Sequence, residues 1–403
     1  MTAAERSIPA RSRPPALDVV VVGGGMAGAA AALALARGGF SATLLEARQP
    51  RPWSAAEDCD LRVVGLAPSS MALLSDLGVW TSIREARCSA FRQMHVWDAQ
   101  GGAAIHFDAA ASGRAELGCI VENRLVQSVL WDALPAAGVR VLCPARVQEL
   151  AAGAERIELA LADGSAVSAR LVVAADGIAS PLRRLAGIAT RGHAYGQLAV
   201  VAHVATERAH QATAWQRFLP GGPLALLPLA DGRSSIVWSL PEAEAQRVLA
   251  LDDPAFMDAV GAASDFRLGR VTATTRRAAF PLQLQLAASY QAPRMVLLGD
   301  AAHAVHPLAG QGANLGLRDV AELRDTLHSA RLAGRDIGAA HVLRRYARRR
   351  RSADTLDALG FDALARVYGW TAPPLVAARN MGIRLLGHMA PVKRRIARHA
   401  AGA

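Results

Sequence analysis

The segment Gly299–Asp319 combines residue types that can bind a phosphorylated ligand rich in hydroxyl groups. Its first two residues, Gly299 and Asp300, follow the mostly apolar run 294–298, which is typical of a buried strand. A carboxylate at the end of such a strand can accept hydrogen bonds from the hydroxyl groups of a nucleotide. This beginning of the segment therefore predicts one side of a nucleotide site.

The second half of the segment supplies backbone donors. Gly310, Gln311 and Gly312 directly precede a helical pattern that begins near Asn314. The free N–H groups at a helix start attract anions, and glycine lets a ligand approach the backbone closely. The segment thus predicts a strand, a polar turn and a helix that together hold a large nucleotide cofactor. An ordinary strand-to-helix loop rich in small residues is the alternative that this segment alone leaves open.

A second nucleotide pattern lies near the N-terminus. Gly23, Gly25 and Gly28 form a GxGxxG after the apolar strand 18–22 and before an alanine-rich helix that runs to Arg37. This order of strand, glycine turn and helix opens a dinucleotide-binding unit, because the turn and the helix start hold the pyrophosphate.

The expected remainder of that unit follows directly. A second strand, 41–45, ends at Glu46, 18 residues past the last glycine, close to where an acid that binds the ribose is expected. The uncharged run 19–36 is also long enough to be a candidate transmembrane helix. The three consecutive glycines 23–25 argue against that interpretation, because they split the run into a short strand and a helix.

A second acid-glycine pair occurs at another strand end. The strand 166–174 leads into Asp176 and Gly177, again just before a helix. Two such strand ends, at Asp176 and Asp300, flank an intervening segment, and they predict one cofactor that is held from both sides.

Two arginines and a glutamine are further candidates. Arg62 lies in the short extended piece 60–67, and its guanidinium fork can bind phosphate oxygens at two points. Arg124 opens a helix that runs to Leu134, and Gln127 lies on the same helix face, so both can meet a cofactor. For all three, a partly exposed side chain on a solvated face is the alternative.

Short strands separated by glycine turns fill two stretches. Residues 139–174 are predicted to form a meander that leads back to the nucleotide fold, and residues 194–280 a mostly antiparallel insert. Because α/β cofactor domains rarely close their own pocket, the insert is expected to cover the cofactor and offer an apolar face to the substrate.

The chain after the cofactor segment is expected to be helical. An arginine cluster, Arg344, Arg345 and 348–351, predicts a solvated helix face. In the stretch 375–398 apolar residues mix with bases. This composition predicts either a helix that docks on an anionic membrane or one that packs on the main domain.

Length and charge limit the classes of protein. With 403 residues, the chain exceeds the size of one typical core, so two domains or a discontinuous large one are expected. The net charge of +11 attracts anions. Nucleic acid is not expected among them, because the sequence contains no zinc finger and no RNA-binding motif. The first 17 residues lack the apolar region of a signal peptide, which predicts a flexible start and a cytoplasmic protein.

The four cysteines do not suggest a metal site. Cys59, Cys88, Cys119 and Cys143 lie far apart and show no spacing typical of metal ligands. They are predicted to be free, buried thiols.

The ordered set of GxGxxG at Gly23, the DG motif at Asp176 and the GD motif at Gly299 resembles the group A FAD-dependent aromatic hydroxylases, the para-hydroxybenzoate hydroxylase superfamily. Within that superfamily, three more runs resemble the ubiquinone-biosynthesis hydroxylases. They are WQRFLP at 215–220, GPLALLP at 222–228 and HPLAGQG at 306–312. The similarity covers nearly the whole chain from Asp18.

The resemblance implies an activity and its partners. FAD would be the cofactor, NADH or NADPH and dioxygen the co-substrates, and an electron-rich phenol ring the group that is hydroxylated. The implied substrate is a prenylated aromatic compound of ubiquinone biosynthesis, reached at the inner face of a membrane alongside other quinone-biosynthesis proteins. The protein's own task would then be mainly to shield the site from water. A hydroxylase of a small soluble aromatic compound and a flavin-binding scaffold are the alternatives.

The resemblance also assigns roles to residues. Glu46 would hold the adenosine ribose, Arg62 and Arg124 the pyrophosphate side, and Asp300 the ribityl and phosphate region. Asp176 would serve FAD and nicotinamide together.

The flavin ring would face the segment from Pro307 to Asn314, which includes Gly310, Gln311 and Gly312. No tyrosine lies in a motif that identifies a catalytic base. His303 and His306 suit a structural role at least as well as a catalytic one.

The expected fold class is α/β, with an FAD-binding Rossmann-like domain, an inserted, mostly antiparallel substrate sheet and a helical C-terminal region. We expect residues 18–185 and 286–340 to form the discontinuous FAD-binding domain. The substrate sheet would occupy 186–285, the C-terminal helices 341–403, and the flexible start 1–17.

Overall fold

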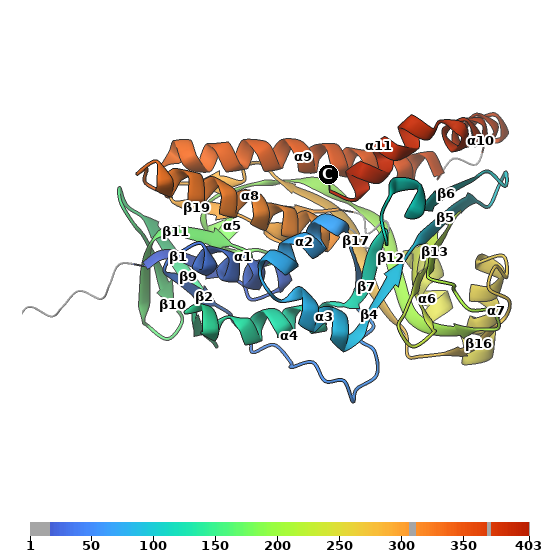
Figure 1. Cartoon of the computed structure of the whole chain (residues 1–403), viewed down its shortest axis with the longest axis horizontal. Coiled ribbons are helices and arrows are strands. Elements are labelled where there is room, and N and C mark those ends of the chain that lie inside the picture. Colours follow the sequence, from blue (N-terminus) through green and yellow to red (C-terminus); the bar gives the residue numbers. More distant parts are fainter. Residues whose placement is uncertain (1–16, 306–311, 369–371, 403) are drawn as a thin grey trace, which may run out of the picture.

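The computed structural model describes residues 17–305, 312–368 and 372–402 (Figure 1). Two large sheets and one small sheet form the framework, and helices pack against them. This mixed α/β architecture confirms the expected fold class, including the helical C-terminal region. The predicted flexible start lies outside the described residues up to position 16, and the boundaries between domains stay a prediction.

The first large sheet, sheet A, carries the nucleotide motifs. Its strand order is β18-β19-β11-β1-β2-β8, and the hairpin partners β10 and β9 attach to β11. Strands β19, β11, β1, β2 and β8 run parallel. The strands are β1 Leu17–Val22, β2 Ala42–Leu45, β8 Arg140–Leu142, β9 Val147–Ala152, β10 Ile157–Leu161, β11 Ala166–Ala174, β18 Gln291–Ala292 and β19 Met295–Leu297.

Both faces of sheet A are covered, which explains why β1 is almost purely valine. Val19 and Val21 face helices α1, α4, α8 and α9, whereas Val20 and Val22 face the meander of β9, β10 and β11. The first four helices of the chain and the two long ones are α1 Met26–Arg37, α2 Pro68–Asp76, α3 Trp80–Arg87, α4 Asn123–Ala133, α8 Gly312–Leu332 and α9 Ala340–Tyr368. A short helix, α5 Pro181–Leu185, and three 3₁₀ turns, η1 Ala110–Ser112, η2 Pro135–Ala137 and η3 Gly299–Ala301, complete this part.

The long apolar run near the N-terminus divides at its glycines, as predicted. Its first part is β1 and its second part is α1, so it is not one helix. Within the described ranges, no helix is long and apolar enough to cross a membrane.

The second large sheet, sheet C, is the predicted antiparallel insert with additions. Its order is β20-β17-β12-β15-β14-β13-β5-β6, with β16 beside β12. Strand β5 pairs with β13 in parallel, and the other described pairs are antiparallel. The strands are β5 Gln93–Asp98, β6 Ala104–Asp108, β12 Thr190–Thr206, β13 Thr213–Leu219, β14 Gly222–Pro228, β15 Ser234–Pro241, β16 Val271–Thr274, β17 Ala278–Ala287 and β20 His303–Ala304.

Sheet C has one face closed by helices and one face turned toward the rest of the molecule. Helices α6 Glu242–Leu249 and α7 Asp253–Ala263, which the sequence analysis did not predict, cover the face of Leu224, Leu226 and Ile236. The opposite face includes Ala225 and Leu227 and packs on a small sheet. This small sheet has the order β3-β7-β4, with β3 Val63–Leu66, β4 Cys88–Phe91 and β7 Gly118–Glu122.

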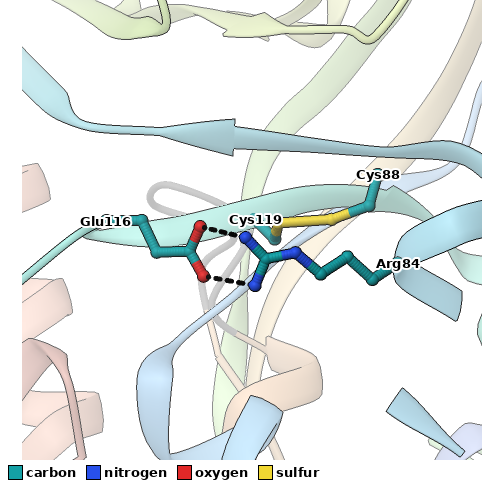
Figure 2. The surroundings of a disulfide bond; sticks show 4 residues. All are labelled: Arg84, Cys88, Glu116 and Cys119. Atoms are coloured by element: carbon teal, nitrogen blue, oxygen red, sulfur yellow. Dashed lines mark hydrogen bonds and ion pairs between the residues drawn. A yellow bond between two sulfur atoms is a disulfide. The ribbon is translucent and has the colours of Figure 1, made fainter. Parts of the chain in front are cut away.

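The prediction of four free, buried thiols was wrong. Cys88 and Cys119 form a disulfide between β4 and β7, next to an ion pair of Arg84 and Glu116 (Figure 2). The two strands pair antiparallel, and Cys88 lies opposite Val121, two residues from Cys119 on the same face. That proximity comes from strand pairing, which spacing in the sequence does not reveal.

The other two cysteines are only half-buried. Cys59 and Cys143 remain free thiols, as predicted, but neither belongs to the buried core.

The last two helices, α10 Pro373–His388 and α11 Ala390–Ala400, are anchored on sheet C near β6. Arg379 forms a buried ion pair with Asp98 at 2.6 Å, where both side chains are at most 2% exposed. Ile383 joins Phe218 in a small apolar cluster beside it. One side of α10 is therefore part of the fold, as the packing alternative had predicted.

Candidate functional site

The three nucleotide motifs meet at one edge of sheet A. The glycine turn follows β1, Asp176 follows β11, Asp300 follows β19 and Glu46 follows β2. These four strands are neighbours in the order β19-β11-β1-β2 and run parallel, so their carboxyl ends share one edge. Ligands of open α/β sheets bind at such an edge. The structure thus brings together residues that are up to 277 positions apart in the chain, as a single cofactor site requires.

The three glycines of GxGxxG have different tasks. At Gly23 the φ angle is +104°, and a Cβ atom would lie 2.2 Å from the carbonyl oxygen of Ala175. At Gly28 a Cβ atom would lie 1.9 Å from the carbonyl oxygen of Gly23. These two glycines therefore allow the turn, the helix and β11 to pack closely. At Gly25 no atom lies within 4 Å of the Cβ position, so this glycine borders open space.

That open space lies at the start of α1, where backbone donors are free. Gly25 is the N-cap of α1, and because glycine has no side chain it cannot cap the first N–H groups of the helix. The first N–H groups of a helix lack partners inside the helix and attract anions. A pyrophosphate fits this place, because the space at the Gly25 Cβ position is open and lies at a helix start.

Helix α4 holds the glycine turn from the side. Gln127 Nε2 and Trp131 Nε1 each donate a hydrogen bond of 2.7 Å to the carbonyl oxygen of Gly24. Gln127 had been a candidate for contact with the cofactor, and in the structure its amide binds the turn. Trp131 had not been predicted, because nothing in its local sequence pattern marks it.

Glu46 also contacts the glycine turn. Its carboxylate accepts the N–H of Gly24 at 2.5 Å and the N–H of Arg48 at 3.0 Å. The side chain is half-buried at the end of β2, where a ribose-binding acid is expected. Its predicted contact with the adenosine ribose stays a prediction.

Asp176 lies in the turn between β11 and α5. Its carboxylate accepts hydrogen bonds from Ser180 Oγ at 2.5 Å and from the N–H of Leu182 at 2.9 Å. Burial raises the pKa of Asp176, and these two donors oppose that shift. Gly177 next to it has a φ angle of +82° and no neighbour within 4 Å of its Cβ position. Asp176 thus orders this turn, whereas its role toward FAD and nicotinamide stays a prediction.

Asp300 presents its carboxylate to the site. It is exposed to solvent at the start of the turn after β19, yet the surrounding protein raises the pKa of its carboxyl by desolvation. The charges of His303 and Arg62 oppose this shift. A carboxylate that is solvent-accessible but surrounded by protein suits hydrogen bonds to the hydroxyl groups of a ligand.

The two predicted phosphate arginines differ in their surroundings. Arg62 lies just before β3, not inside a strand as predicted, and its exposed guanidinium stands 5.4 Å from the ring centre of Phe280. Arg124 is paired with Glu57 at 2.7 Å and with Asp60 at 3.6 Å. Arg62 is therefore the more accessible of the two, and neither role in phosphate binding is tested.

The start of α8 contains the last described candidates. Helix α8 begins at Gly312, two residues before the predicted position. The side chain of Asn314 is 2% exposed and bonds the backbone of Gly65 and Ala67. Its amide therefore ties α8 to β3. The candidates Pro307, Gly310 and Gln311 lie outside the described residues, as does His306.

A group of buried ionisable side chains lies behind the Asp300 turn, and we call it the Asp319 cluster. It consists of His303, Asp319, Arg350 and Asp354, each at most 7% exposed. The solvated face predicted for the arginine cluster was wrong for Arg350, because α9 packs this side of its surface against α8. His303 Nε2 lies 2.7 Å from Oδ2 of Asp319, a contact that suits the structural role considered for this histidine, and the role itself stays a prediction.

Three of the four tyrosines, Tyr290, Tyr346 and Tyr368, do not suit the role of a catalytic base. Tyr290 and Tyr346 are at most 1% exposed, and burial raises the pKa of both phenols above their ordinary value. Burial also raises the pKa of Tyr368, to about 12. These three phenols are therefore protonated at neutral pH.

The donor set fits FAD. The open space at Gly25, the helix start beside it and the accessible carboxylate of Asp300 lie at one sheet edge, as a dinucleotide with a pyrophosphate and polyhydroxylated chains requires. When bound, FAD would supply the redox chemistry that none of these side chains provides.

Comparison with known proteins agrees with this reading of the site. Residues 16–355 match the family described as FAD binding domain. The chain is 36% identical over 386 residues to the 3-demethoxyubiquinol 3-hydroxylase of Escherichia coli, covering 96% of this chain and 98% of the relative. It is 38% identical over 388 residues to the ubiquinone hydroxylase UbiL of Rhodospirillum rubrum, covering 96% and 89% of the two chains.

Solved structures share the fold. The p-nitrophenol 4-monooxygenase of Pseudomonas putida superposes with a TM-score of 0.75 at 20% identity, over 96% of this chain and 98% of that one. The protein HpxO of Klebsiella pneumoniae, in complex with FAD and uric acid, has a TM-score of 0.73 at 20% identity, over 96% of both chains.

Proposed function

Because the chain belongs to the ubiquinone-biosynthesis hydroxylases of the FAD-binding family, and is therefore an FAD-dependent aromatic-ring monooxygenase, we propose that its substrate is a prenylated phenol. NADH or NADPH would provide the electrons and dioxygen the oxygen atom. The observation that supports the cofactor part of the proposal is the row of four neighbouring strand ends with the glycine turn, Glu46, Asp176 and Asp300. The names of the relatives supply the substrate class.

The chain's own residues bind the cofactor and exclude water. The start of α1 at Gly25 would receive the pyrophosphate, and Asp300 would accept hydroxyl groups of the ribityl chain. Above this edge, the face of sheet C that includes Phe280 and Ala199 is turned away from α6 and α7, toward Arg62. An apolar wall at that place would hold an aromatic ring and keep water from the reacting atoms.

A test of the activity uses the purified protein with bound FAD. Oxidation of NADH and NADPH is recorded with a prenylated phenol and with the same phenol lacking the prenyl chain. Stimulation by the prenylated compound, with formation of its hydroxylated product, is expected. A preference for the short phenol would favour the hydroxylase of a soluble aromatic compound. FAD binding without any reaction would favour a scaffold role among other quinone-biosynthesis proteins.

We further propose that the chain works at the inner face of a membrane, because the outer side of α10 is apolar and exposed. Met381 and Leu385 lie one turn apart on this side and are 64% and 56% exposed, and Met389, directly after the helix, is 44% exposed. The inner side of the same helix carries the buried residues Arg379 and Ile383. Helix α10 thus has one side packed on the protein and another side with exposed apolar residues.

The charge of this region favours anionic lipid. From residue 372 to the end, the chain contains no acidic residue. Arg384, Arg395 and Arg398 are exposed beside the apolar side chains, and Ile396 on α11 is 42% exposed. Each basic side chain near an anionic surface contributes about 1 kcal/mol to the free energy of membrane binding at low salt. Burial of the apolar side chains in the lipid contributes further. A cytoplasmic protein that binds the membrane surface in this way would meet its prenylated substrate in the bilayer where that substrate resides.

We expect the double substitution Met381→Glu with Leu385→Glu to weaken binding to anionic liposomes by about tenfold or more, because it removes apolar contact and adds repulsion. Co-sedimentation at low and high salt measures the effect, and wild-type binding should fall as salt rises. Leu332→Glu, at a 77% exposed position on α8, is the matched control. Equal lipid binding by both variants and the wild type would contradict the proposal. Since the inner side of α10 is part of the fold, substitution is a cleaner test than truncation.

A further inference from the structure

The turn that carries Asp300 is held at both ends by one carboxylate. Oδ2 of Asp319 accepts the N–H of Gly299 at 2.8 Å and lies 2.7 Å from Nε2 of His303. Gly299 directly precedes Asp300, and His303 follows it by three positions. A single group on α8 therefore fixes the backbone before the exposed acid and the side chain after it.

Arg350 holds this carboxylate in place from α9. Its Nε donates to Oδ1 of Asp319 at 2.5 Å, and its Nη2 donates to Oδ1 of Asp354 at 2.5 Å. Because Arg350 and Asp354 lie one turn apart on α9, the Asp319 cluster connects the cofactor turn with α8 and α9. Charge-assisted bonds of this kind are short and directional, and so they define the position of the turn.

Because the Asp319 cluster is buried, an uncompensated net charge in it would destabilise the fold. Two carboxylates and one guanidinium leave one negative charge, which a protonated His303 neutralises. Burial alone would lower the pKa of His303, but the charges of Asp319 and Asp354 outweigh it and raise the pKa to about 9. Burial, with the charge of Asp319, raises the pKa of Asp354 to about 7. Both shifts indicate that the cluster retains a proton at neutral pH.

A metal ion is not needed to explain these residues. The ligand atoms of His303, Asp319 and Asp354 lie within 4.8 Å of one another, a spacing that can hold a cation. The guanidinium of Arg350 already contacts both carboxylates and supplies the positive charge there.

We propose that Asp319 is a positioning residue for the cofactor, which fixes the turn 299–303 so that the Asp300 carboxylate faces the ribityl and phosphate side of FAD. Asp319 is buried and acts through Gly299 and His303, not by touching the ligand. The inference rests on the proposed function in one respect, since it requires that FAD bind beside Asp300. The residues of the Asp319 cluster thereby gain a role in cofactor positioning that the proposed function does not assign to them.

The test compares two substitutions of buried acids. Asp319→Asn removes the charge that Gly299, His303 and Arg350 share and should raise the dissociation constant of FAD by about tenfold or more. Asp357→Asn is the matched control, because Asp357 is a buried acid of α9 that pairs with Arg318 at 3.1 Å and does not contact the turn. The control should lose thermal stability without a change in FAD affinity beyond about twofold.

A second pair of variants keeps the test decisive if Asp319→Asn does not fold. His303→Gln retains a side-chain donor toward Asp319, whereas His303→Ala does not. The alanine variant, which lacks both the charge and the donor, should lose about tenfold in FAD affinity, and the glutamine variant, which lacks only the charge, should lose less.

The pH dependence of FAD binding distinguishes positioning from general stability. The groups that face His303 are Asp319 on α8, Arg350 and Asp354 on α9, the ring of Tyr290 at 6.1 Å and Asp300 on its own turn. A raised pKa means that the stabilisation of the fold by protonated His303 is fully present below the ordinary value of 6.5 and is lost as the pH rises through about 9. Because the proposal has protonated His303 hold the Asp300 turn through Asp319, loss of this proton should also weaken FAD binding. FAD affinity of the wild type should therefore fall toward pH 9, and His303→Gln should show no such fall.

Specific outcomes would overturn the inference. They are equal FAD affinity of Asp319→Asn and the wild type, an equal loss in the Asp357→Asn control, equal affinities of the two His303 variants, or the same fall with pH in His303→Gln. Failure of the wild type itself to bind FAD would instead overturn the proposed function.

Discussion

Replacement of Gly25 by alanine is expected to abolish FAD binding while the protein remains folded. The Cβ position of Gly25 has no neighbour within 4 Å, and its φ of −66° suits any residue, so alanine fits the protein itself. The methyl group would enter the space above the start of α1 where the pyrophosphate is expected. Loss of two charge-assisted hydrogen bonds there corresponds to a decrease in affinity of about a hundredfold or more.

The control for this prediction is another glycine of the same turn. Gly28→Ala would place a methyl group 1.9 Å from the carbonyl oxygen of Gly23, so α1 must move away from β1. That variant should lose about 1 to 3 kcal/mol of unfolding free energy, whereas Gly25→Ala should not. Flavin fluorescence titration and thermal unfolding of the apoprotein measure the two effects. Undiminished FAD binding by Gly25→Ala would show that the cofactor does not lie over this helix start.

The second large effect is expected for Asp300→Ala. The substitution removes the exposed carboxylate after β19 that should accept cofactor hydroxyl groups, at about 1 to 3 kcal/mol, or roughly tenfold to a hundredfold in FAD affinity. Asp300→Asn retains one acceptor oxygen and should lose less. Equal FAD affinities of the wild type and the alanine variant, measured by the same titration, would remove Asp300 from the site.

Local patterns predicted the cofactor half of the fold well. The valine strand, the glycine turn and the alanine-rich helix occupy consecutive residues, so hydrophobic periodicity and glycine positions suffice to recognise them. The acid-glycine pairs at Asp176 and Asp300 were also visible as strand ends. The sequence predicted that these two strand ends hold one cofactor from both sides, and the structure adds that their strands, β11 and β19, are parallel neighbours.

Contacts between distant segments were not predictable in the same way. The disulfide of Cys88 and Cys119 depends on the register of β4 and β7, and the burial of Arg350 depends on which side of α9 meets α8. An arginine-rich helix looks solvated in sequence, because only the fold reveals that Asp319 and Asp354 receive one of its guanidinium groups. Asp319 is the last residue of the segment Gly299–Asp319, yet its proposed positioning role is evident only from the bonds that it makes to Gly299, His303 and Arg350.

Sheet C shows a further limit of sequence patterns. Strand β5, with its hairpin partner β6, joins the sheet by pairing with β13, although more than 100 residues separate β5 from β13 in the chain, and no local signal marks that pairing. The helices α6 and α7 cover one face of the sheet and were missed because the turns and short strands around them dominated the pattern. The expected role of the insert, to cover the cofactor and offer an apolar face to the substrate, stays a prediction.

Transfer of oxygen from labelled dioxygen to a prenylated phenol tests the central claim most directly. The protein with bound FAD is incubated with NADH or NADPH, the phenol and isotopically labelled dioxygen, and the product is analysed by mass spectrometry. We predict a hydroxylated ring that carries one labelled oxygen atom, and no such product from Gly25→Ala. Oxidation of the nicotinamide that yields only hydrogen peroxide, or a ring hydroxyl group that derives from water, would contradict the account.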